Sequence, residues 1–218
     1  MKKSTALTAL PCAVLMAAIG MFGGGLIYPA RSAPADGIPA IGQLRIHRTW
    51  MPKAHPSAFA VGFPSGLNFC FDALRGNLIY AWEGDFVDLS PTVNGKIPRD
   101  AVIRGTIFYA ADTVSGFRTG NGSSPPEIRF KGHRVKKENP EFHYEVDGVP
   151  VWETVRVAPN GAGLIRQFRV TTPDRAVTYS PAQPTTISID SGAGTLADGQ
   201  VRIPGNSTVV FSLPISRP

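Results

Sequence analysis

From Gln43 to the end of the chain, the sequence consists of short runs rich in Val, Ile, Phe, Tyr and Thr. Clusters of Gly, Pro, Asn and Asp separate these runs, and no amphipathic helical stretch with end caps occurs among them. Short strands at this spacing are typical of β-sandwiches and β-barrels. We therefore predict a single all-β domain over residues 43–218, a β-sandwich built of antiparallel meanders. The predicted strands are residues 43–50, 58–63, 66–72, 77–83, 103–110, 126–135, 141–147, 149–158, 163–171, 185–190, 199–203 and 207–213.

The first 35 residues have the order of a secretory signal. Lys2 and Lys3 precede an uncharged apolar run from about Ala6 to Ile27, and small residues then cluster at Ala30, Ser32, Ala33 and Ala35. We expect a signal peptide, helical in its apolar part, over residues 1–35 and a linker over residues 36–42. The mature protein is then periplasmic or secreted. The alternative is an uncleaved membrane anchor, because the apolar run approaches the roughly 20 residues that span a bilayer.

The charge of the mature chain argues against one class of partner. Cleavage after residue 35 removes Lys2, Lys3 and Arg31 but no acid, so the formal net charge falls from +6 to +3. Such a small and scattered excess is too weak to predict nucleic-acid binding. Cleavage also leaves Cys70 as the sole cysteine, and its aromatic neighbours on both sides predict a buried, inert thiol.

The sequence around residues 136–140 favours a hairpin in one particular register. Pairing Val135 with Glu141 makes one face charged and complementary and the other apolar, and a slip of one residue would mix the two faces. The other pairs in this register are His133 with His143, Lys131 with Glu145, Phe130 with Val146 and Gly132 with Tyr144.

Two further turns follow this hairpin. Asp147–Gly148 is a strong signal for a two-residue hairpin turn, and Pro159–Asn160–Gly161 predicts the next reversal of the chain. Residues 126–171 are therefore expected to form a four-stranded meander.

The facing histidines His133 and His143, with Glu145 nearby, suggest a site for a divalent ion, since imidazole binds such metals. Two histidines do not supply the ligand number that a metal site needs, and polar residues face one another on any solvated sheet. The sequence also has no Cys-x-x-Cys-His for c-type haem, no phosphate-binding glycine loop and no nucleophile elbow. We therefore expect neither a metal nor another cofactor.

The best candidate for a ligand site is the stretch from Tyr80 to Asp88. Tyr80 and Trp82 share one face of a strand, and three carboxylates follow at Glu83, Asp85 and Asp88. An aromatic platform beside hydrogen-bond acceptors is typical of sugar binding. Two of these carboxylates could instead hydrolyse a glycosidic bond across a cleft. The third alternative is that both rings fill the core and the acids lie in a turn.

Several segments of the chain resemble a known kind of domain. They are Phe59–Pro64, Leu67–Asp72, Leu78–Asp88, Phe130–Arg134 and Phe142–Gly148. Over residues 45–171 they resemble an exported β-domain of environmental bacteria that often lies beside c-type cytochrome domains and predicted sugar or alcohol dehydrogenases. The second half is also similar to the β-supersandwich of mutarotase-like and glycosidase-associated domains. The resemblance implies a supersandwich-like fold and an accessory role outside the cytoplasm, with a c-type cytochrome or dehydrogenase as partner. It transfers no catalytic residue.

Three functions are thus open at the level of sequence. The leading one is an exported, non-catalytic module that binds carbohydrate or a partner redox enzyme. The second is a glycoside-acting enzyme that uses two of the carboxylates Glu83, Asp85 and Asp88, and the third is a structural module of the cell envelope. Ring faces of Trp82 or Trp152 that are open to solvent favour binding, and a deep carboxylate-lined cleft favours catalysis.

Overall fold

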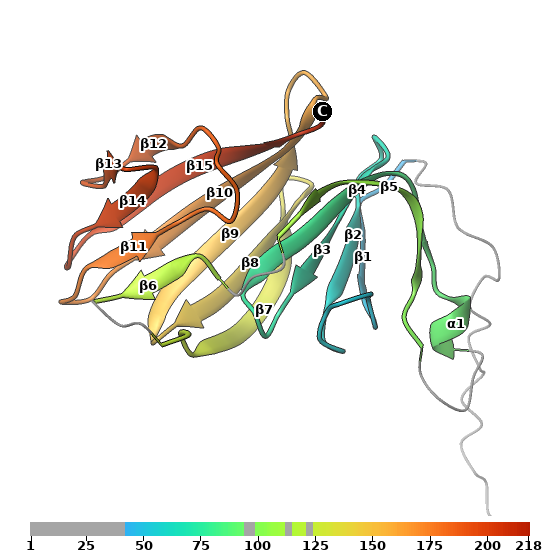
Figure 1. The fold of residues 1–218 in the computed structure, drawn as a ribbon, viewed down its shortest axis with the longest axis horizontal. Coiled ribbons are helices and arrows are strands. Elements are labelled where there is room, and N and C mark those ends of the chain that lie inside the picture. Colours follow the sequence, from blue (N-terminus) through green and yellow to red (C-terminus); the bar gives the residue numbers. More distant parts are fainter. Residues whose placement is uncertain (1–41, 94–98, 112–114, 121–123) are drawn as a thin grey trace, which may run out of the picture. The chain divides into compact units, whose positions relative to one another are not determined.

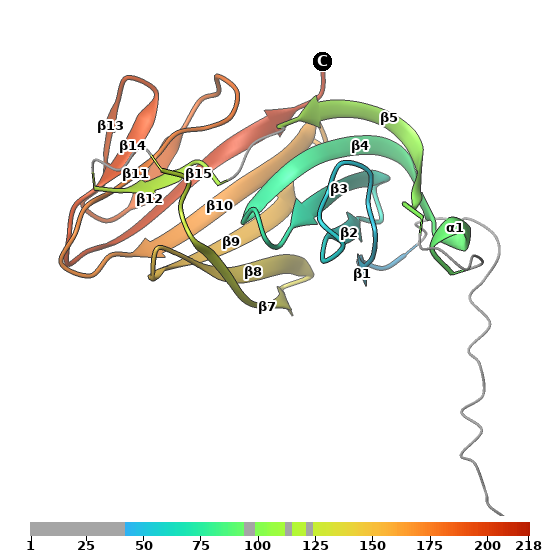
Figure 2. The same cartoon turned by 60° about the horizontal axis from the view of Figure 1, so that its bottom comes forward.

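The computed structural model describes residues 42–93, 99–111, 115–120 and 124–218, which form three antiparallel sheets (Figure 1). The five-stranded sheet is a meander in which each strand pairs with the next one along the chain. Its strands are β1 (Arg45–Arg48), β2 (Phe59–Gly62), β3 (Leu67–Asp72), β4 (Asn77–Asp88) and β5 (Val102–Ala110). The end of β4 and the start of β5 extend past the other three strands as a curved two-stranded ribbon. This ribbon ends beside the one-turn helix α1 (Ser90–Val93) (Figure 2).

The six-stranded sheet has the order β12-β15-β10-β9-β8-β7, and the four-stranded sheet has the order β13-β14-β11-β6. The strands of the six-stranded sheet are β7 (Ile128–Lys136), β8 (Asn139–Val146), β9 (Val149–Val157), β10 (Gly163–Thr171), β12 (Ser188–Ser191) and β15 (Thr208–Ser216). Those of the four-stranded sheet are β6 (Phe117–Thr119), β11 (Val177–Tyr179), β13 (Thr195–Ala197) and β14 (Gln200–Ile203).

One face of the six-stranded sheet packs against both smaller sheets, and a single hydrophobic cluster joins all three. Against the five-stranded sheet, the rings of Phe71 and Phe142 stack with centroids 4.0 Å apart. Against the four-stranded sheet, Phe168 contacts Phe117 and Tyr179 at 5.5 and 5.0 Å. Alternate residues of β8, β9, β10 and β15 point into this core, and the residues between them lie on the opposite face. The predicted all-β sandwich of antiparallel strands is confirmed.

Each predicted strand overlaps an observed one, but β6, β11 and β13 were not predicted. Each of these three strands has only three residues, which is too short for an alternating pattern to stand out in the sequence. They belong to the four-stranded sheet, whose β6 and β11 come from distant parts of the chain. Tertiary pairing therefore defines this sheet more than its local sequence does.

The predicted register of the hairpin around residues 136–140 is wrong. The chain turns within two residues, Lys137 and Glu138, whose φ angles of 49° and 61° are those of a type I′ turn. The pairs are therefore Arg134 with Glu141, His133 with Phe142 and Gly132 with His143. The prediction failed because neither turn residue is a glycine or an asparagine, the usual signals for this turn.

A bulge between Phe130 and Gly132 shifts the register of β7 once more. Lys131 is the extra residue in the bulge, and its ammonium group lies 2.9 Å from a carboxylate oxygen of Glu145. The predicted contact between these two charges thus exists, although the backbone partner of Glu145 is Arg129. The extra residue reverses the alternation of β7 beyond it, so Gly132 and Arg134 share the outer face with His143 and Glu141, and His133 lies on the core side.

The remaining turns of the meander are as predicted. Val146 pairs with Val149 across the two-residue turn Asp147–Gly148, whose φ angles are 48° and 80°. The next turn closes with a hydrogen bond from the amide of Gly161 to the carbonyl of Ala158. Strands β7 to β10 therefore form the expected four-stranded meander.

The predicted signal peptide over residues 1–35 and the predicted linker up to residue 41 lie outside the described residues. In the described part of the chain, no helix is both long enough and apolar enough to cross a membrane.

Candidate functional site

The structure places both aromatic rings of the predicted site in a second, smaller core. Trp82 is 0% exposed, and its indole N–H donates hydrogen bonds to the carbonyls of Asp85 and Phe86 at 3.0 and 3.2 Å. Tyr80 is buried beside it, with ring centroids 6.1 Å apart. Met51 and Ala101 from outside the strands, and Phe86 and Val87 from the far end of β4, belong to the same buried cluster. The expected exposed platform of Tyr80 and Trp82 is therefore wrong.

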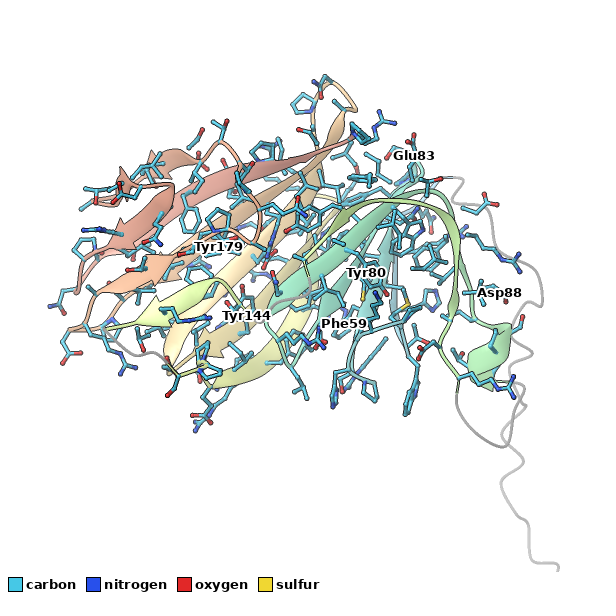
Figure 3. The ribbon with its side chains drawn as sticks, viewed as in Figure 1. Phe59, Tyr80, Glu83, Asp88, Tyr144 and Tyr179 are labelled. Carbon is cyan, nitrogen blue, oxygen red and sulfur yellow. The ribbon has the colours of Figure 1, made fainter. Side chains whose placement is uncertain are left out.

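The three predicted carboxylates are exposed or partly exposed. Glu83 and Asp88 lie well apart along β4 (Figure 3). Glu83 forms an ion pair with Arg217. It lines a pocket of about 290 Å³ that has neither Asp85 nor Asp88 in its wall. Asp85 is exposed. Ligand binding by these three acids stays a prediction, now without the aromatic rings.

Asp88 is held as a carboxylate by its neighbours. It accepts hydrogen bonds from Ser90 at 2.9 Å and from Arg104 at 2.6 Å. These bonds, those from Ser90 first, lower the pKa of Asp88 to about 2. A general acid in glycoside hydrolysis needs a raised pKa, so Asp88 has the opposite property.

Cys70 lies in the same small core as Trp82, directly opposite Tyr80. Burial raises the pKa of its thiol to about 12. The predicted buried thiol is confirmed, and the high pKa keeps it protonated and unreactive at neutral pH.

The outer face of the six-stranded sheet carries a different group of side chains. There Trp152 of β9 stands between His143 of β8 and Arg169 of β10, its two cross-strand neighbours. The imidazole of His143 is parallel to the indole, with centroids 4.5 Å apart and an angle of 4°. The guanidinium carbon of Arg169 lies 3.9 Å from the indole centroid. We call these three residues the Trp152 strip.

A row of hydrogen-bonding groups runs beside the Trp152 strip on the same face, two residues further along each strand. At its β7 end, Glu141 accepts hydrogen bonds from Arg134 at 2.6 Å and from Thr154 at 3.3 Å. At its β12 end, Asp190 accepts hydrogen bonds from Gln167 at 2.8 Å and from Ser212 at 3.1 Å. The face therefore combines a stack of flat groups with alternating donors and acceptors.

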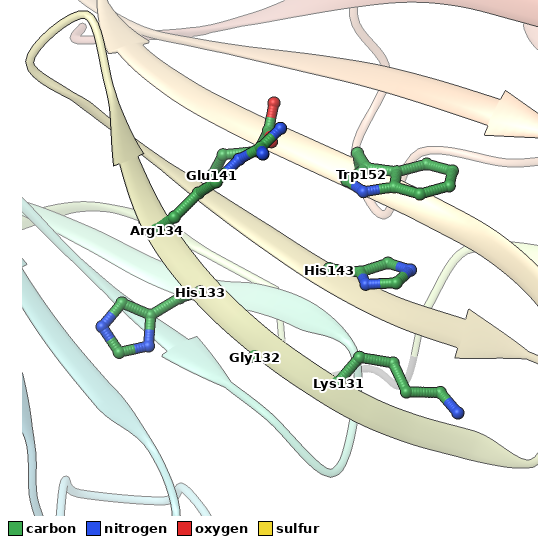
Figure 4. Close-up of a pocket in the computed structure, with 7 residues that line it drawn as sticks. All are labelled: Lys131, Gly132, His133, Arg134, Glu141, His143 and Trp152. Carbon is green, nitrogen blue, oxygen red and sulfur yellow. The ribbon is translucent and has the colours of Figure 1, made fainter.

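A pocket of about 220 Å³ opens where the Trp152 strip meets the β7–β8 hairpin (Figure 4). Its wall is formed by Lys131, Gly132, His133, Arg134, Glu141, His143 and Trp152. The bulge in β7 helps to form this pocket, because Gly132 has a φ of 144° and no atom lies within 4 Å of where its Cβ would be. A larger residue would not adopt this backbone conformation without strain.

His143 is a neutral neighbour of Trp152 rather than half of a metal site. His133 points away from it, and its ring lies 4.8 Å from that of Phe59 on the core side of the hairpin (Figure 4). The predicted facing of His133 and His143, which a metal ion shared by the two would need, is therefore wrong. Among the described residues, no group of three or more metal-ligating side chains occurs.

The surroundings of His143 favour its uncharged form. Burial lowers the pKa of His143, and the cations Lys131 and Arg169 lower it further, against the opposing carboxylates of Glu145 and Glu141. Its Nε2 atom is buried and has no hydrogen-bond partner in the described structure. The ring thus serves mainly as a flat support for the indole.

The sequence indicates Trp152 as a ring that could be exposed, but its grouping with His143 and Arg169 emerges only in the structure. The sequence does contain a signal that pairs His143 with Trp152. The Asp147–Gly148 turn pairs Val146 with Val149, and counting outward from it puts His143 opposite Trp152. The next turn does not fix a register in the same way, so Arg169 could not be placed by counting alone.

Comparison with known proteins identifies no relative: no family model matches the chain, and no curated protein or solved structure is significantly similar to it. The resemblance to exported domains found beside cytochromes therefore stays a prediction. The chemistry of the Trp152 strip and of its pocket is therefore the basis for proposing a function.

Proposed function

We propose that the protein is an exported, non-catalytic β-sandwich module that binds carbohydrate on the outer face of its six-stranded sheet. The observation that carries this proposal is the partly exposed indole of Trp152, held between His143 and Arg169 at the edge of a pocket. His143 and Arg169 cover the two faces of the indole, so a sugar would meet its edge and its N–H group together with the hydrogen-bond donors and acceptors beside it.

The rigidity of the Trp152 strip supports this role. Contacts with the imidazole at 4.5 Å and with the guanidinium at 3.9 Å hold the indole in one orientation. A side chain that is already ordered loses little further conformational entropy when a ligand binds. The indole N–H has no hydrogen-bond partner among the described residues, so it is available to a hydroxyl group.

The row from Arg134 to Asp190 supports an extended ligand. It crosses the six-stranded sheet from β7 to β12. Glu141 is buried, and beyond it the row presents the hydroxyl of Thr154, the amide of Gln167 and the carboxylate of Asp190. A chain of sugar rings presents hydroxyl groups at regular intervals and would meet such a row along its length. The same row consists mainly of polar and charged side chains. The buried centre of a protein–protein interface is depleted in charged residues, so the row does not resemble one. We therefore favour carbohydrate over a redox enzyme as the partner.

Binding rather than catalysis is supported by the carboxylates of the pocket. Glu141 is the one acidic residue in its wall, and it is paired with Arg134 and lies 3.7 Å from Lys136. Glycoside hydrolysis needs two carboxyl groups facing each other across the substrate. The pocket does not provide such a pair.

The test is a glycan array probed with the wild type, Trp152→Ala and Trp50→Ala. Trp50 is a suitable control because it is 41% exposed and lies outside the six-stranded sheet. We expect the wild type to bind a glycan, Trp152→Ala to lose about tenfold or more in affinity, and Trp50→Ala to bind as the wild type does. Equal binding by Trp152→Ala, or no glycan binding by the wild type, would overturn the proposal.

A further inference from the structure

The Trp152 strip contains a cation whose charge is not balanced nearby. The ammonium of Lys131 is paired with Glu145, and the guanidinium of Arg134 is paired with Glu141. Arg169 has no acidic partner among the described residues; its described contact is with the face of the Trp152 indole. One positive charge therefore stands on the strip without a carboxylate from the protein.

The contact with Trp152 leaves the hydrogen-bonding capacity of Arg169 intact. A contact with the face of a ring uses none of the five N–H donors of a guanidinium, and those of Arg169 have no hydrogen-bond partner among the described residues. A planar guanidinium can bind both oxygens of a carboxylate or sulfate at once. Because the indole holds the guanidinium 3.9 Å above its ring, this donor set is ordered before a ligand arrives.

Trp152, the neighbour of Arg169 on the strip, is also a hydrogen-bond donor. The indole N–H of Trp152 has no partner in the described structure. Burial lowers the pKa of His143, which is thus neutral near pH 7 and does not repel the guanidinium. The acids of the neighbouring row already have partners: Glu141 accepts hydrogen bonds from Arg134 and Thr154, and Asp190 accepts them from Gln167 and Ser212. The Trp152 strip therefore offers hydrogen-bond donors and a positive charge to a ligand.

We infer that the ligand is an acidic glycan, one that carries carboxylate or sulfate groups, and that Arg169 binds an anionic group of it beside Trp152. This inference rests on the proposed function and makes it more specific. A neutral sugar would leave the charge of Arg169 unmatched. A carboxylate or sulfate would complete the pairing that Glu145 and Glu141 already provide for the other two cations.

The experiment compares glycans that share a backbone and differ in charge. Polygalacturonate is compared with its fully methyl-esterified form, and dextran sulfate with dextran, for the wild type, Arg169→Gln, Arg169→Lys and Arg202→Gln. Arg202 is an exposed arginine on β14 of another sheet and is the matched control. Denaturant midpoints establish that each variant is folded.

We expect the wild type to bind at least one acidic glycan about tenfold or more tightly than its neutral counterpart, with affinity falling as salt is raised. Arg169→Gln should reduce that preference to about twofold or less, Arg169→Lys should retain part of it, and Arg202→Gln should leave it unchanged. Equal binding of charged and neutral partners overturns the inference while supporting carbohydrate binding in general. Binding of no glycan overturns both.

Two further outcomes also decide against the inference. If Arg202→Gln weakens binding as much as Arg169→Gln does, the attraction is a general effect of charge rather than a site. If inorganic sulfate displaces the acidic glycan at an equal concentration of anionic groups, the strip binds a simple anion and does not recognise the sugar.

Discussion

The imidazole of His143 lies parallel to the indole of Trp152 across strands β8 and β9, with their centroids 4.5 Å apart. Arg169 contacts the same indole from β10. Three neighbouring strands thus each contribute one flat side chain to a single stack on the outer face of the sheet. Because the meander fixes the register of these strands, the stack is a property of the fold and not of a mobile loop.

The ionisation of His143 should make the protein less stable in mild acid. Burial lowers its pKa in the folded state below the ordinary histidine value of 6.5, so the unfolded chain binds the proton more readily. The contribution of His143 to stability is then complete above about pH 6.5 and is lost as the pH falls through the folded pKa. The groups that face it are Lys131, Glu145, Glu141 and Arg169.

Urea midpoints between pH 8 and pH 5 measure this effect in the wild type and in His143→Phe, which keeps a flat ring. We expect the midpoint of the wild type to fall more steeply below pH 6.5 than that of the variant. His47, whose pKa is also lowered by burial, contributes with the same sign, so a slope remains in His143→Phe. Parallel curves for the two proteins would show that His143 does not titrate as described.

Trp82 and Trp152 should differ in what their removal costs. Trp82 is fully buried, so Trp82→Ala leaves a cavity and is expected to lower the free energy of unfolding by about 3–5 kcal/mol. Trp152 is partly exposed, so Trp152→Ala loses mainly the contacts with its stacked neighbours, about 1–2 kcal/mol. Chemical denaturation measures both, and a smaller loss for Trp82→Ala than for Trp152→Ala would contradict these positions.

The difference between these two tryptophans shows where the sequence is informative. The Asp147–Gly148 turn is a local signal, and it determines which residues lie opposite one another on β8 and β9. The burial of Trp82 has no such local signal, because residues 77–82 are buried on both faces. One face meets the main core, and the other is covered by residues such as Met51 and Phe86 that fold back over the sheet.

The register of the β7–β8 hairpin was equally hard to predict. Its turn places Lys137 and Glu138 at positive φ, which few residues other than glycine and asparagine adopt, so residue type did not indicate it. The bulge at Lys131 then changes which residues of β7 face outward on its two sides, and alternation in the sequence cannot show such an insertion.

Inside the main core, Arg166 should be far more important for stability than an arginine on the surface. Its Nε lies 2.6 Å from Glu153, and its Nη2 donates to Asn77 of the five-stranded sheet at 2.9 Å. Both members of the ion pair are buried, so Arg166→Met leaves the carboxylate of Glu153 without its cation. We expect a loss of about 3–5 kcal/mol in the free energy of unfolding.

The matched control for Arg166→Met is Arg129→Met, which breaks the exposed pair with Glu127 and should cost less than about 1 kcal/mol. A double variant that replaces both Arg166 and Glu153 with methionine should recover part of the loss, because no unpaired charge then stays buried. Equal destabilisation by Arg166→Met and Arg129→Met would contradict the role of the buried pair.

The most direct test of carbohydrate binding at the Trp152 strip follows the indole N–H resonances of Trp50, Trp82 and Trp152 by NMR during titration with the tightest-binding glycan from the array. Each resonance is assigned by a Trp→Phe variant. The structure predicts that the signal of Trp152 shifts and saturates with ligand, while those of Trp50 and of the buried Trp82 stay in place. A saturating shift at Trp50 or Trp82 with none at Trp152 would contradict the assignment of the site.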